Sequence, residues 1–533
     1  MALIWPGDYR TSLSALGYLS IYGLLNRRPD VLAERFFWPD GDLAETYRRS
    51  GASLLSLESG RPLRDFDLVA ASLSLENDYW RLPALLAAGG LAPNRIERSD
   101  DDPPVLAGGV AVWANPWPLW PWVDLILTGE AEAQWPQLLA SAFNCASLLK
   151  NDFLRHLAGN TPGALLPEVL TNLSPAVRPA ALAWPPPEAL LPPVSPIVSP
   201  QAEFSRVRLV EISRGCPHGC RFCLTGALFR PHRPWPLKAI LQALGPPATE
   251  KVGLVGSAAA EHPDLSELLA ELFRQGRTVT ISSLRLTALT PNLAEKLAAG
   301  HLHGVAVAPE AGSQALRNRL NKDLTESQIL DGVRLLSGAG LKNIKLYFII
   351  GLPGEIQADL AALANLAREI RRAAGIRPAL TLSLANFTPK PHTPLEGAAM
   401  NTAEELKRKG AWVVKALKGL PGLKVNLDPP LWSITQGLLA RGGPDSGRLV
   451  AALLRHQGRL KPSLAEFGYT SSHPLHRPWP DNQPRPWRLI QTASGLKHLT
   501  EEAARAGHGL LTSPCPRENN CGRCSACAKL SDL

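Results

Sequence analysis

The sequence EISRGCPHGCRFCLTG, at residues 211–226, is the most informative stretch of this chain. It places Cys216, Cys220 and Cys223 in a C-x3-C-x2-C spacing directly after a short apolar run. Three thiolates on one tight loop can bind three irons of a cubane [4Fe-4S] cluster and leave the fourth iron without a protein ligand. The alternative is a zinc knuckle, but structural zinc sites use four ligands, and His218 within the loop is poorly placed to be the fourth. The spacing therefore favours an iron–sulfur cluster with one open iron.

The segments that follow this loop alternate between short apolar runs and stretches with helical character. Six such runs are expected to be strands, at residues 207–213, 251–257, 278–284, 304–310, 343–351 and 379–387. Strands that alternate with helices in this way are typical of repeated βα units. Six units are fewer than the eight of a closed barrel, so the pattern predicts a partial (β/α)6 TIM-like barrel. In such barrels the chemistry lies on the loops that follow the strands.

The N-terminal part of the chain shows a separate, open α/β pattern. Its expected buried strands are residues 67–75, 104–112 and 123–129. A parallel sheet of this kind binds ligands at the carboxyl ends of its strands. The residues expected there are Ser72, Ser74, Gly108 and Gly109.

The expected fold class is therefore α/β, with a Rossmann-like sheet, a partial barrel and a small cysteine-rich C-terminal region. We divide the chain into a Rossmann-like domain (1–140), a helical and proline-rich linker (141–203), the barrel (204–400) and a C-terminal helical extension with a cysteine-rich tail (401–533).

A second group of cysteines, Cys515, Cys521, Cys524 and Cys527, ends the chain. The two groups hold seven of the eight cysteines, and clustered thiols in a long chain indicate metal ligation rather than disulfides. Four thiolates at short spacings fit either a structural zinc site or an auxiliary iron–sulfur cluster. We favour the iron–sulfur cluster, and the zinc site remains the alternative.

The charge and hydropathy of the chain restrict its location and partners. Its net charge of +9 is uneven, with −6 over residues 1–150 and +9 over residues 401–533. A polyanion would be attracted to the C-terminal half, although a solvated basic surface explains the same charge, so nucleic acid is not the favoured partner. No long apolar run predicts a membrane span, and Asp8 and Arg10 interrupt the N-terminus where a signal peptide would be apolar. We expect a cytoplasmic protein without a membrane partner.

The motif at residues 211–226 resembles the signature of the radical S-adenosylmethionine (SAM) enzymes, whose core is a partial six-strand βα barrel. The resemblance implies that Cys216, Cys220 and Cys223 bind a [4Fe-4S] cluster and that SAM chelates its open iron. One electron from the cluster then cleaves the sulfonium of SAM to give a 5′-deoxyadenosyl radical. The resemblance also implies an electron donor such as flavodoxin or ferredoxin.

The ends of the later strands match the same family in chain order. The SAM-binding residues that the resemblance implies are Ser257, Ser283, Arg285, Glu310 and Gly351. The loop at residues 256–261, GSAAAE, departs from the glycine- and acid-containing motif that the family carries there. This departure favours the alternative of a non-catalytic iron–sulfur scaffold or regulatory protein.

The segments APEAGSQALRNRLNK, KLYFIIGLPGE and FTPKPHTP resemble a subgroup of the family that carries an N-terminal cobalamin-binding-type domain. The stretch DLVAASLSLENDYW resembles that domain. The usual domain presents Asp-x-His-x-x-Gly, whose histidine ligates cobalt, whereas residues 1–135 contain no histidine. Two interpretations stay open: a domain that binds cobalamin without this ligand, and a domain that only shields the radical site.

Three functions follow from these alternatives, and none assigns a catalytic side chain. With cobalamin, the resemblance implies methyl transfer to an unreactive carbon. Without it, the resemblance implies hydrogen abstraction followed by rearrangement or group transfer. A tRNA-modifying enzyme in the manner of methylthiotransferases is a further alternative, but those enzymes carry a cluster in the N-terminal third, where this chain has only Cys145 and is acidic.

Two other features have competing interpretations. His392 follows the sixth expected barrel strand, and it is either a substrate contact or a loop residue held rigid by its neighbouring prolines. The stretch WANPWPLWPW at residues 113–122 predicts an apolar interface between domains rather than a platform for stacking bases. Cys145 is expected to be a buried apolar residue.

Overall fold

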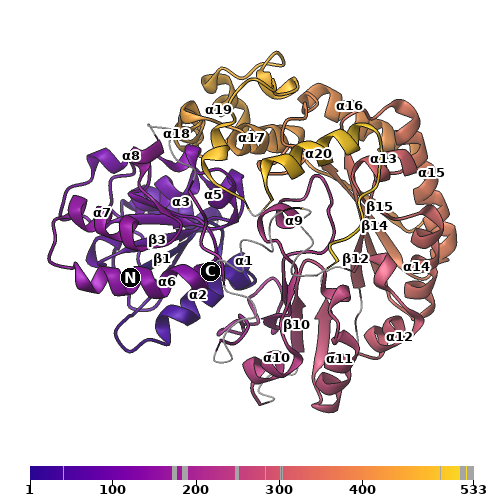
Figure 1. The fold of residues 1–533 in the computed structure, drawn as a ribbon, viewed down its shortest axis with the longest axis horizontal. Helices are drawn as coiled ribbons and strands as arrows, with labels where there is room; N and C mark the ends of the chain where they lie inside the picture. Colours follow the sequence, from indigo (N-terminus) through magenta and orange to yellow (C-terminus); the bar gives the residue numbers. More distant parts are fainter. Residues whose placement is uncertain are drawn as a thin grey trace.

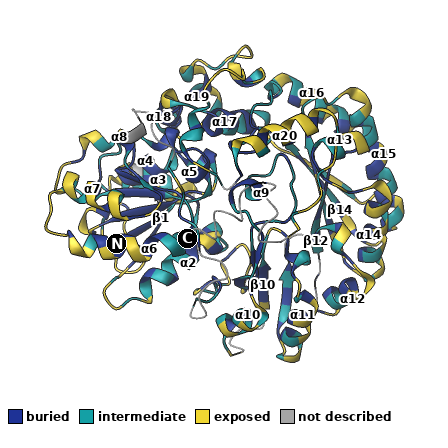
Figure 2. Ribbon diagram, viewed as in Figure 1, coloured by how far each residue is buried: buried dark blue, intermediate teal, exposed yellow. Residues whose placement is uncertain are grey.

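The computed structural model describes residues 1–516 and Cys524, apart from residues 40, 171–176, 183–189, 247–250, 282–283, 301, 303 and 493. Two α/β units lie side by side, and a group of C-terminal helices bridges them along one edge (Figure 1). The strands of both units are largely buried, whereas the exposed residues gather on the outer helices (Figure 2). No helix in the described ranges combines the length and apolarity that a membrane span needs.

The N-terminal unit is a six-stranded sheet with the strand order β2-β1-β3-β4-β5-β6, parallel except at β6. Its strands are β1 (Ala2–Trp5), β2 (Glu34–Phe37), β3 (Val69–Ser72), β4 (Val105–Gly108), β5 (Leu125–Leu127) and β6 (Ala164–Leu165). Its helices are α1 (Tyr9–Ser12), α2 (Leu16–Asn26), α3 (Gly41–Ser50), α4 (Arg81–Ala88), α5 (Val110–Ala114), α6 (Ala131–Asn144), α7 (Lys150–Asn160) and α8 (Pro167–Leu170).

The three strands expected in this unit are present, and each is shorter than predicted at both ends. The run at residues 104–112 is not strand throughout, because the chain turns at Gly109 and α5 begins at Val110. Gly109 has φ 109°, and a Cβ there would clash with the backbone of Leu73, so only glycine fits this turn. The sequence did not predict β1 and β2, which are only four residues long.

The second unit is a partial barrel of parallel strands, and all six expected strands are confirmed. They are β7 (Arg208–Glu211), β10 (Lys251–Val255), β11 (Thr278–Ile281), β12 (Gly304–Glu310), β13 (Asn343–Ile350) and β14 (Ala379–Asn386). The strand order is β11-β10-β7 in one sheet and β12-β13-β14 in the other, which a further strand, β15 (Leu423–Leu427), extends beside β14. A backbone hydrogen bond from the Leu284 N–H to the Ala306 carbonyl, 2.9 Å, links the two sheets. A short antiparallel pair, β8 (Ser213–Arg214) and β9 (Arg233–Pro234), lies beside β7.

A seventh barrel strand, β15 (Leu423–Leu427), was not expected. The sequence predicts that the barrel ends at residue 400 and that a helical extension follows, but α16 (Ala403–Ala416) leads into β15, which pairs with β14. The residues of β15 are mostly exposed, since it is an edge strand, and it therefore lacks the apolar run by which buried strands are recognised.

The remaining helices cover the barrel or bridge the two units. Those of the barrel are α9 (Leu224–Leu228), α10 (Leu237–Leu244), α11 (Leu265–Arg274), α12 (Pro291–Ala299), α13 (Gln314–Arg319), α14 (Glu326–Gly338) and α15 (Gln357–Ala374). The C-terminal helices are α17 (Pro430–Ala440), α18 (Gly447–Arg455), α19 (Leu460–Phe467) and α20 (Leu496–Gly507).

The C-terminal helices share an apolar core with the N-terminal sheet. Leu73 and Trp117 from the sheet side and Leu439 and Leu453 from α17 and α18 are buried in this one core. The Trp117 indole donates to the carbonyl of Pro486 at 2.9 Å. The predicted interface role of the tryptophan-rich stretch is therefore confirmed.

The proline-rich part of the predicted linker is described at residues 177–182 and 190–203, since residues 171–176 and 183–189 lie outside the described residues. Its second end packs against the barrel, because the Ser195 amide donates to the Leu209 carbonyl and the Ser195 hydroxyl accepts from the Leu209 amide, both at 2.9 Å.

Glu396, in the loop after β14, connects the barrel to the C-terminal segment. Its buried carboxylate accepts from the Trp487 indole at 2.6 Å, from Arg488 at 2.8 Å and from Arg485. Burial alone would raise the pKa of Glu396, but the neighbouring His392, in its protonated form, and the guanidinium groups of Arg488 and Arg485 outweigh burial and hold the pKa below its ordinary value. The loop and the C-terminal segment are thus joined through one buried anion.

We predict that the substitution E396A lowers the free energy of unfolding by about 3–5 kcal/mol, because it leaves buried cationic and polar groups without their partner. Chemical denaturation followed by tryptophan fluorescence measures this loss. The matched control is E466A, which removes an exposed carboxylate paired with Arg455 and should change stability little. Equal stabilities of the two variants would contradict the bridging role of Glu396.

Candidate functional site

The cysteine loop lies where the sequence predicts it, between β8 and α9 at the carboxyl end of the first barrel strand. Gly215 precedes the first cysteine with φ 75°, and a Cβ there would clash with the carbonyl oxygen of Phe229. The loop can therefore turn this tightly only with glycine at this position. Cys216, Cys220 and Cys223 are each half-buried.

The three thiols lie close enough to influence one another's charge. Burial, followed by the neighbouring Cys220 thiolate, raises the pKa of Cys216 to about 12, and the same two causes raise the pKa of Cys223. Backbone N–H groups oppose this effect: that of His218 donates to Cys216, and those of Thr225 and Gly226 donate to Cys223. The N–H groups favour the thiolate forms, and a cation bound to the thiolates would favour them further. Such a cation would lower the pKa values of Cys216 and Cys223 again.

The donor set fits a cluster better than a single ion. Within the described ranges, no three His, Cys, Asp or Glu side chains converge as ligands of one metal ion. A cubane differs, because each thiolate binds a different iron and the thiols must stand apart. Three thiols that influence one another without meeting at one point therefore fit a [4Fe-4S] cluster with one open iron.

Arg221, between the second and third cysteines, fastens the loop to the C-terminal segment. Its side chain has no exposed area, and its Nε lies 3.0 Å from a carboxylate oxygen of Glu502 on α20. It also donates to the carbonyls of Asn318 and Leu510 at 3.1 and 2.7 Å. Sequence reasoning missed this role, because an arginine in a polar loop gives no sign of being buried.

The end of β12 brings two buried charges next to the cysteines. Glu310, which has φ 67°, pairs with Lys322 at 3.0 Å. Burial alone would lower the pKa of Lys322, but the carboxylate of Glu310 and the thiolate of Cys220 outweigh it and raise the pKa. Lys322 is therefore a buried ammonium between Glu310 and the cysteine loop, a residue that the sequence did not single out.

The other expected SAM-binding residues lie at different places around this centre. Arg285 is half-buried, donates to the Asp323 carbonyl at 3.1 Å, and is near enough to Cys216 to oppose the rise of its pKa. Gly351 ends β13 in a turn with φ 78°, where its N–H donates to Glu355 at 3.0 Å. Ser283 lies outside the described residues.

The loop after β10 contacts the cysteine loop directly. A carboxylate oxygen of Glu261 lies 2.7 Å from Nε2 of His218, a residue between the first two cysteines in the sequence. Glu261 is the only acid of the GSAAAE segment, which departs from the family motif, and it contacts the cysteine loop. Ser257, from the same segment, borders a cavity that faces the N-terminal unit.

That cavity has a volume of about 360 Å³ and lies between the two units. From the N-terminal sheet it is lined at the carboxyl ends of the strands by Ser72, Ser74, Gly108 and Gly109, as predicted. From the barrel it is lined by Glu211, Ser213, Arg214 and Ser257. The edge-to-face pair of Trp113 and Phe229, 4.9 Å between ring centroids, also borders it. The sheet's ligand edge therefore faces the start of the cysteine loop.

A group of buried ion pairs forms one wall of this cavity. Arg214, two residues before the first cysteine, donates to Glu132 at 2.7 Å and to Glu211 at 2.9 Å. Burial alone would lower the pKa of Arg214, but Glu211, Glu132 and Glu130 raise it well above its ordinary value. Glu130 also pairs with Arg233. Because Glu130 and Glu132 belong to the N-terminal unit, this group fixes the cysteine loop relative to that unit.

His392 is held by structure rather than facing a substrate. Its ring is buried, its Nε2 donates to the Ala114 carbonyl at 3.0 Å, and its backbone N–H donates to Glu396 at 2.7 Å. Burial lowers the pKa of His392 to about 4. Of the two interpretations of His392, the structure supports the rigid loop residue.

The neutral state of His392 predicts a dependence of stability on pH. Its pKa is below the unfolded value, so the unfolded chain takes up the proton first and stability falls as pH decreases from about 6.5 toward 4. Between pH 7 and pH 5, the wild type should lose about 2 kcal/mol more than the variant H392N, since one pKa unit corresponds to 1.36 kcal/mol. Asn keeps the left-handed backbone of this position, φ 61°. Urea denaturation at the two pH values measures the free energy of unfolding of each protein. If the wild type and H392N lose the same free energy between pH 7 and pH 5, His392 is not a buried neutral residue.

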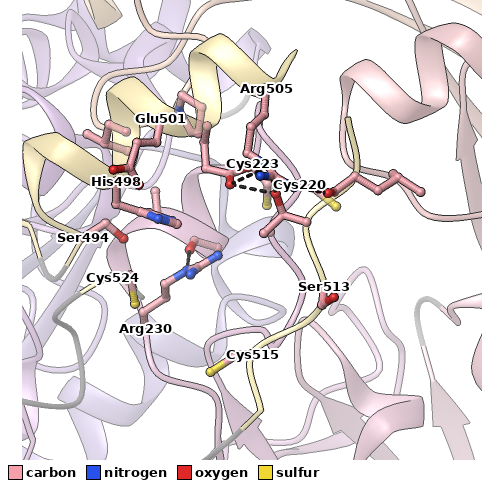
Figure 3. Close-up of a pocket in the computed structure, with 18 of the residues that line it drawn as sticks. Cys220, Cys223, Arg230, Ser494, His498, Glu501, Arg505, Ser513, Cys515 and Cys524 are labelled. Carbon is pink, nitrogen blue, oxygen red and sulfur yellow. Dashed lines mark hydrogen bonds and ion pairs between the residues drawn. The ribbon is translucent and has the colours of Figure 1, made fainter. Parts of the chain in front are cut away.

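A second cavity, of about 590 Å³, lies between the cysteine loop and α20. Cys220 and Cys223 line one side, and Cys515 and Cys524 from the C-terminal tail line the other (Figure 3). The backbone N–H of Cys515 donates to the carbonyl of Pro217 at 2.8 Å. The other two predicted tail ligands, Cys521 and Cys527, lie outside the described residues.

Comparison with known families matches both units of the chain. A family described as radical SAM proteins, N-terminal, matches residues 17–167. The radical SAM superfamily matches residues 210–367. These ranges contain the N-terminal sheet edge and the barrel with its cysteine loop.

Individual proteins are similar over different lengths. The uncharacterized protein MJ0966 of Methanocaldococcus jannaschii is 26% identical over 447 residues, which cover 83% of this chain and 88% of that protein. The tRNA-2-methylthio-N(6)-dimethylallyladenosine synthase of Sorangium cellulosum is 27% identical over 232 residues, which cover 38% of this chain and 45% of that protein.

Among solved structures, the fold is similar to that of TsrM from Kitasatospora setae, a radical SAM methyltransferase with cobalamin and a [4Fe-4S] cluster bound. The TM-score is 0.52, with 76% of this chain and 78% of that chain covered, at 14% identity. At this identity the similarity concerns the fold.

Proposed function

The chain belongs to the radical SAM superfamily, and on that premise we propose that it is an enzyme that cleaves SAM reductively at a [4Fe-4S] cluster held by Cys216, Cys220 and Cys223. The observation that carries the proposal is the arrangement of three half-buried thiols beside the buried Glu310–Lys322 pair. The cluster, when bound, supplies the electron that breaks the sulfonium bond of SAM.

The residues around the thiols have the charges that SAM requires. Lys322 is a buried ammonium near Cys220, so it can pair with the carboxylate of SAM. Glu310 can accept hydrogen bonds from the amino group or the ribose hydroxyls. Arg285 adds positive charge near Cys216 and so favours the thiolate form of that ligand. These side chains would bind and orient SAM at the open iron.

The two other parts of the chain keep water away from this site. The N-terminal unit covers one side of the cysteine loop through the Arg214 ion pairs, and α20 covers another through Arg221. The Arg221 contact is buried and the Arg214 contact is partly buried, so both would hold the loop in place and limit the access of water to it. This is the protection that radical chemistry needs, because water and oxygen quench reactive intermediates.

We further propose that the cavity at the N-terminal sheet binds cobalamin and that the reaction is methyl transfer to an unreactive carbon. The small strand-end residues Ser72 and Gly108 and the apolar Trp113–Phe229 pair line this edge, where a parallel sheet binds its ligand. The fold is similar to that of TsrM, whose structure has cobalamin bound, which supports cobalamin as the ligand. Since no histidine precedes His156, the strand ends β1–β5 that reach this edge would supply cobalt with no histidine ligand.

Neither of the other candidate functions gains support from the site. The similarity to the methylthio synthase covers only 38% of this chain. Cys145, the sole cysteine of the N-terminal third, is buried and its thiol donates to the Ser141 carbonyl at 2.9 Å, so it serves packing rather than ligation. A non-catalytic scaffold would form no 5′-deoxyadenosine even when its cluster is fully loaded. The assay for this product therefore distinguishes a scaffold from an enzyme.

We predict that the anaerobically reconstituted protein, given dithionite and SAM, produces 5′-deoxyadenosine. The variants C216A, C220A and C223A should each lose this product, because each removes one iron ligand. Product is measured by liquid chromatography with mass spectrometry. The matched control is C145A, which removes a buried thiol away from the loop and should retain product. A fully loaded wild type that makes no product would favour a scaffold instead.

We also predict that K322Q weakens SAM binding about 10- to 100-fold, since a hydrogen bond to a charged group contributes about 1.5–3 kcal/mol. Isothermal titration of the cluster-loaded protein under anaerobic conditions measures the dissociation constant. The variant K322R keeps the positive charge and should lose much less affinity. If K322Q binds SAM as tightly as the wild type, Lys322 has no contact with the cofactor.

A further inference from the structure

Two buried side chains that line the cavity of about 360 Å³ carry hydrogen-bond donors without a partner. Trp113 is 6% exposed and Ser213 is 3% exposed, and both border the cavity. Among the residues that the structure describes, neither the Trp113 indole nitrogen nor the Ser213 hydroxyl has a hydrogen-bond partner. Because a buried polar group is normally hydrogen-bonded, these two donors indicate a ligand that brings acceptors to the cavity.

The two donors come from different units of the chain. Trp113 belongs to α5 of the N-terminal unit, and its ring packs edge-to-face against Phe229 of the barrel, 4.9 Å between centroids. Ser213 belongs to β8, three residues before Cys216. A ligand that accepts from both side chains therefore contacts the edge of the N-terminal sheet and the start of the cysteine loop together.

The glycine of the GSAAAE segment leaves room for one of these donors. Gly256 also borders the cavity, and a Cβ at this position would lie 2.6 Å from the Ser213 oxygen. A larger residue at position 256 would therefore displace the hydroxyl. The segment that departs from the family motif thus keeps the surroundings of Ser213 free.

The charged groups on the cavity wall oppose an anionic ligand. Of the described residues that line the cavity, three are acids, Glu130, Glu132 and Glu211, and one is basic, Arg214. Arg214 already donates to Glu132 and Glu211, at 2.7 and 2.9 Å. A carboxylate or phosphate that entered the cavity would meet like charges, and the one cation of this described wall is already paired.

We propose that Trp113 and Ser213 select the ligand of this cavity by donating hydrogen bonds to neutral carboxamide oxygens. A carboxamide offers an oxygen that accepts from the indole N–H and the hydroxyl, and an amino group that donates to the nearby carboxylates. A carboxylate offers acceptors only, so the same wall repels it. This inference rests on the proposed function, because the corrin ring of cobalamin carries carboxamide arms at its rim.

The chain offers a matched control for each of the two donors. Trp122 is 7% exposed, and its indole nitrogen also lacks a partner within the described part of the chain. The Thr161 hydroxyl has the same status, and this residue is 4% exposed. Neither residue borders the cavity. The variants W122F and T161V therefore remove comparable groups at positions that a ligand in the cavity does not contact.

The first test is the binding of dicyanocobinamide, a corrin with its carboxamide arms intact, to the full chain. The absorbance change of the corrin during titration gives the dissociation constant. W113F and S213A should each bind it about 3- to 10-fold more weakly than the wild type, the loss expected for one neutral hydrogen bond. W122F and T161V should bind it like the wild type. Wild-type affinity in both W113F and S213A would overturn the inference.

A second corrin tests the selection between neutral and anionic groups. Dicyanocobyrinic acid has carboxylates where dicyanocobinamide has carboxamides. The wild type should bind it at least about 100-fold more weakly, because the carboxylates would face the glutamates of the wall. Equal affinities of the wild type for the two corrins would contradict the proposed selection.

Urea denaturation without a corrin distinguishes a ligand contact from a structural role of Ser213. S213A should be at least as stable as the wild type, because the hydroxyl makes no bond that the variant loses. A clear loss of stability in S213A would assign the hydroxyl to the fold and overturn the inference. A wild type that binds neither corrin would refute the proposed cobalamin site itself, whereas tight binding that W113F and S213A leave unchanged would refute only the selection.

Discussion

Two ion-paired arginines hold the cysteine loop in place, one on each side of the first thiol pair. Arg214, which is partly buried, is paired with carboxylates of the N-terminal unit and of β7, and Arg221, which is fully buried, is paired with Glu502 of the C-terminal helix α20. A buried guanidinium that loses its carboxylate costs several kcal/mol, so the contact of Arg221 stabilises the position of the loop strongly. The positions of the three thiols are thereby set by all three parts of the chain at once, and the barrel alone does not determine them.

This arrangement gives the loop three distinct surroundings. On the barrel side the Glu310–Lys322 pair provides charges for a zwitterionic cofactor. On the N-terminal side, a cavity of about 360 Å³ opens to the ligand edge of a parallel sheet. On the tail side, a cavity of about 590 Å³ is bordered by Cys515 and Cys524. Cofactor binding and a second ligand can therefore occupy separate spaces around one loop.

The sequence predicted the parts that depend on local pattern and missed those that depend on tertiary contact. The six buried barrel strands were recognisable as apolar runs, whereas β15 is an exposed edge strand and carries no such run. The cysteine spacing predicted that Cys216, Cys220 and Cys223 share one loop, and the structure places all three there. Lys322 and Arg221 were missed, because a charged residue in a polar segment has the same sequence pattern whether it is exposed or buried. Their roles became visible only when distant segments were brought to the loop.

Electron paramagnetic resonance of the dithionite-reduced chain, recorded before and after addition of SAM, examines the open iron itself. If three thiolates leave one iron free for SAM, the reduced-cluster signal of the wild type changes on addition of SAM. The variant C145A should show the same change, because its loop cysteines are intact. A reduced cluster whose spectrum is identical with and without SAM would mean that no iron is open to the cofactor, and would contradict the function assigned to Cys216, Cys220 and Cys223.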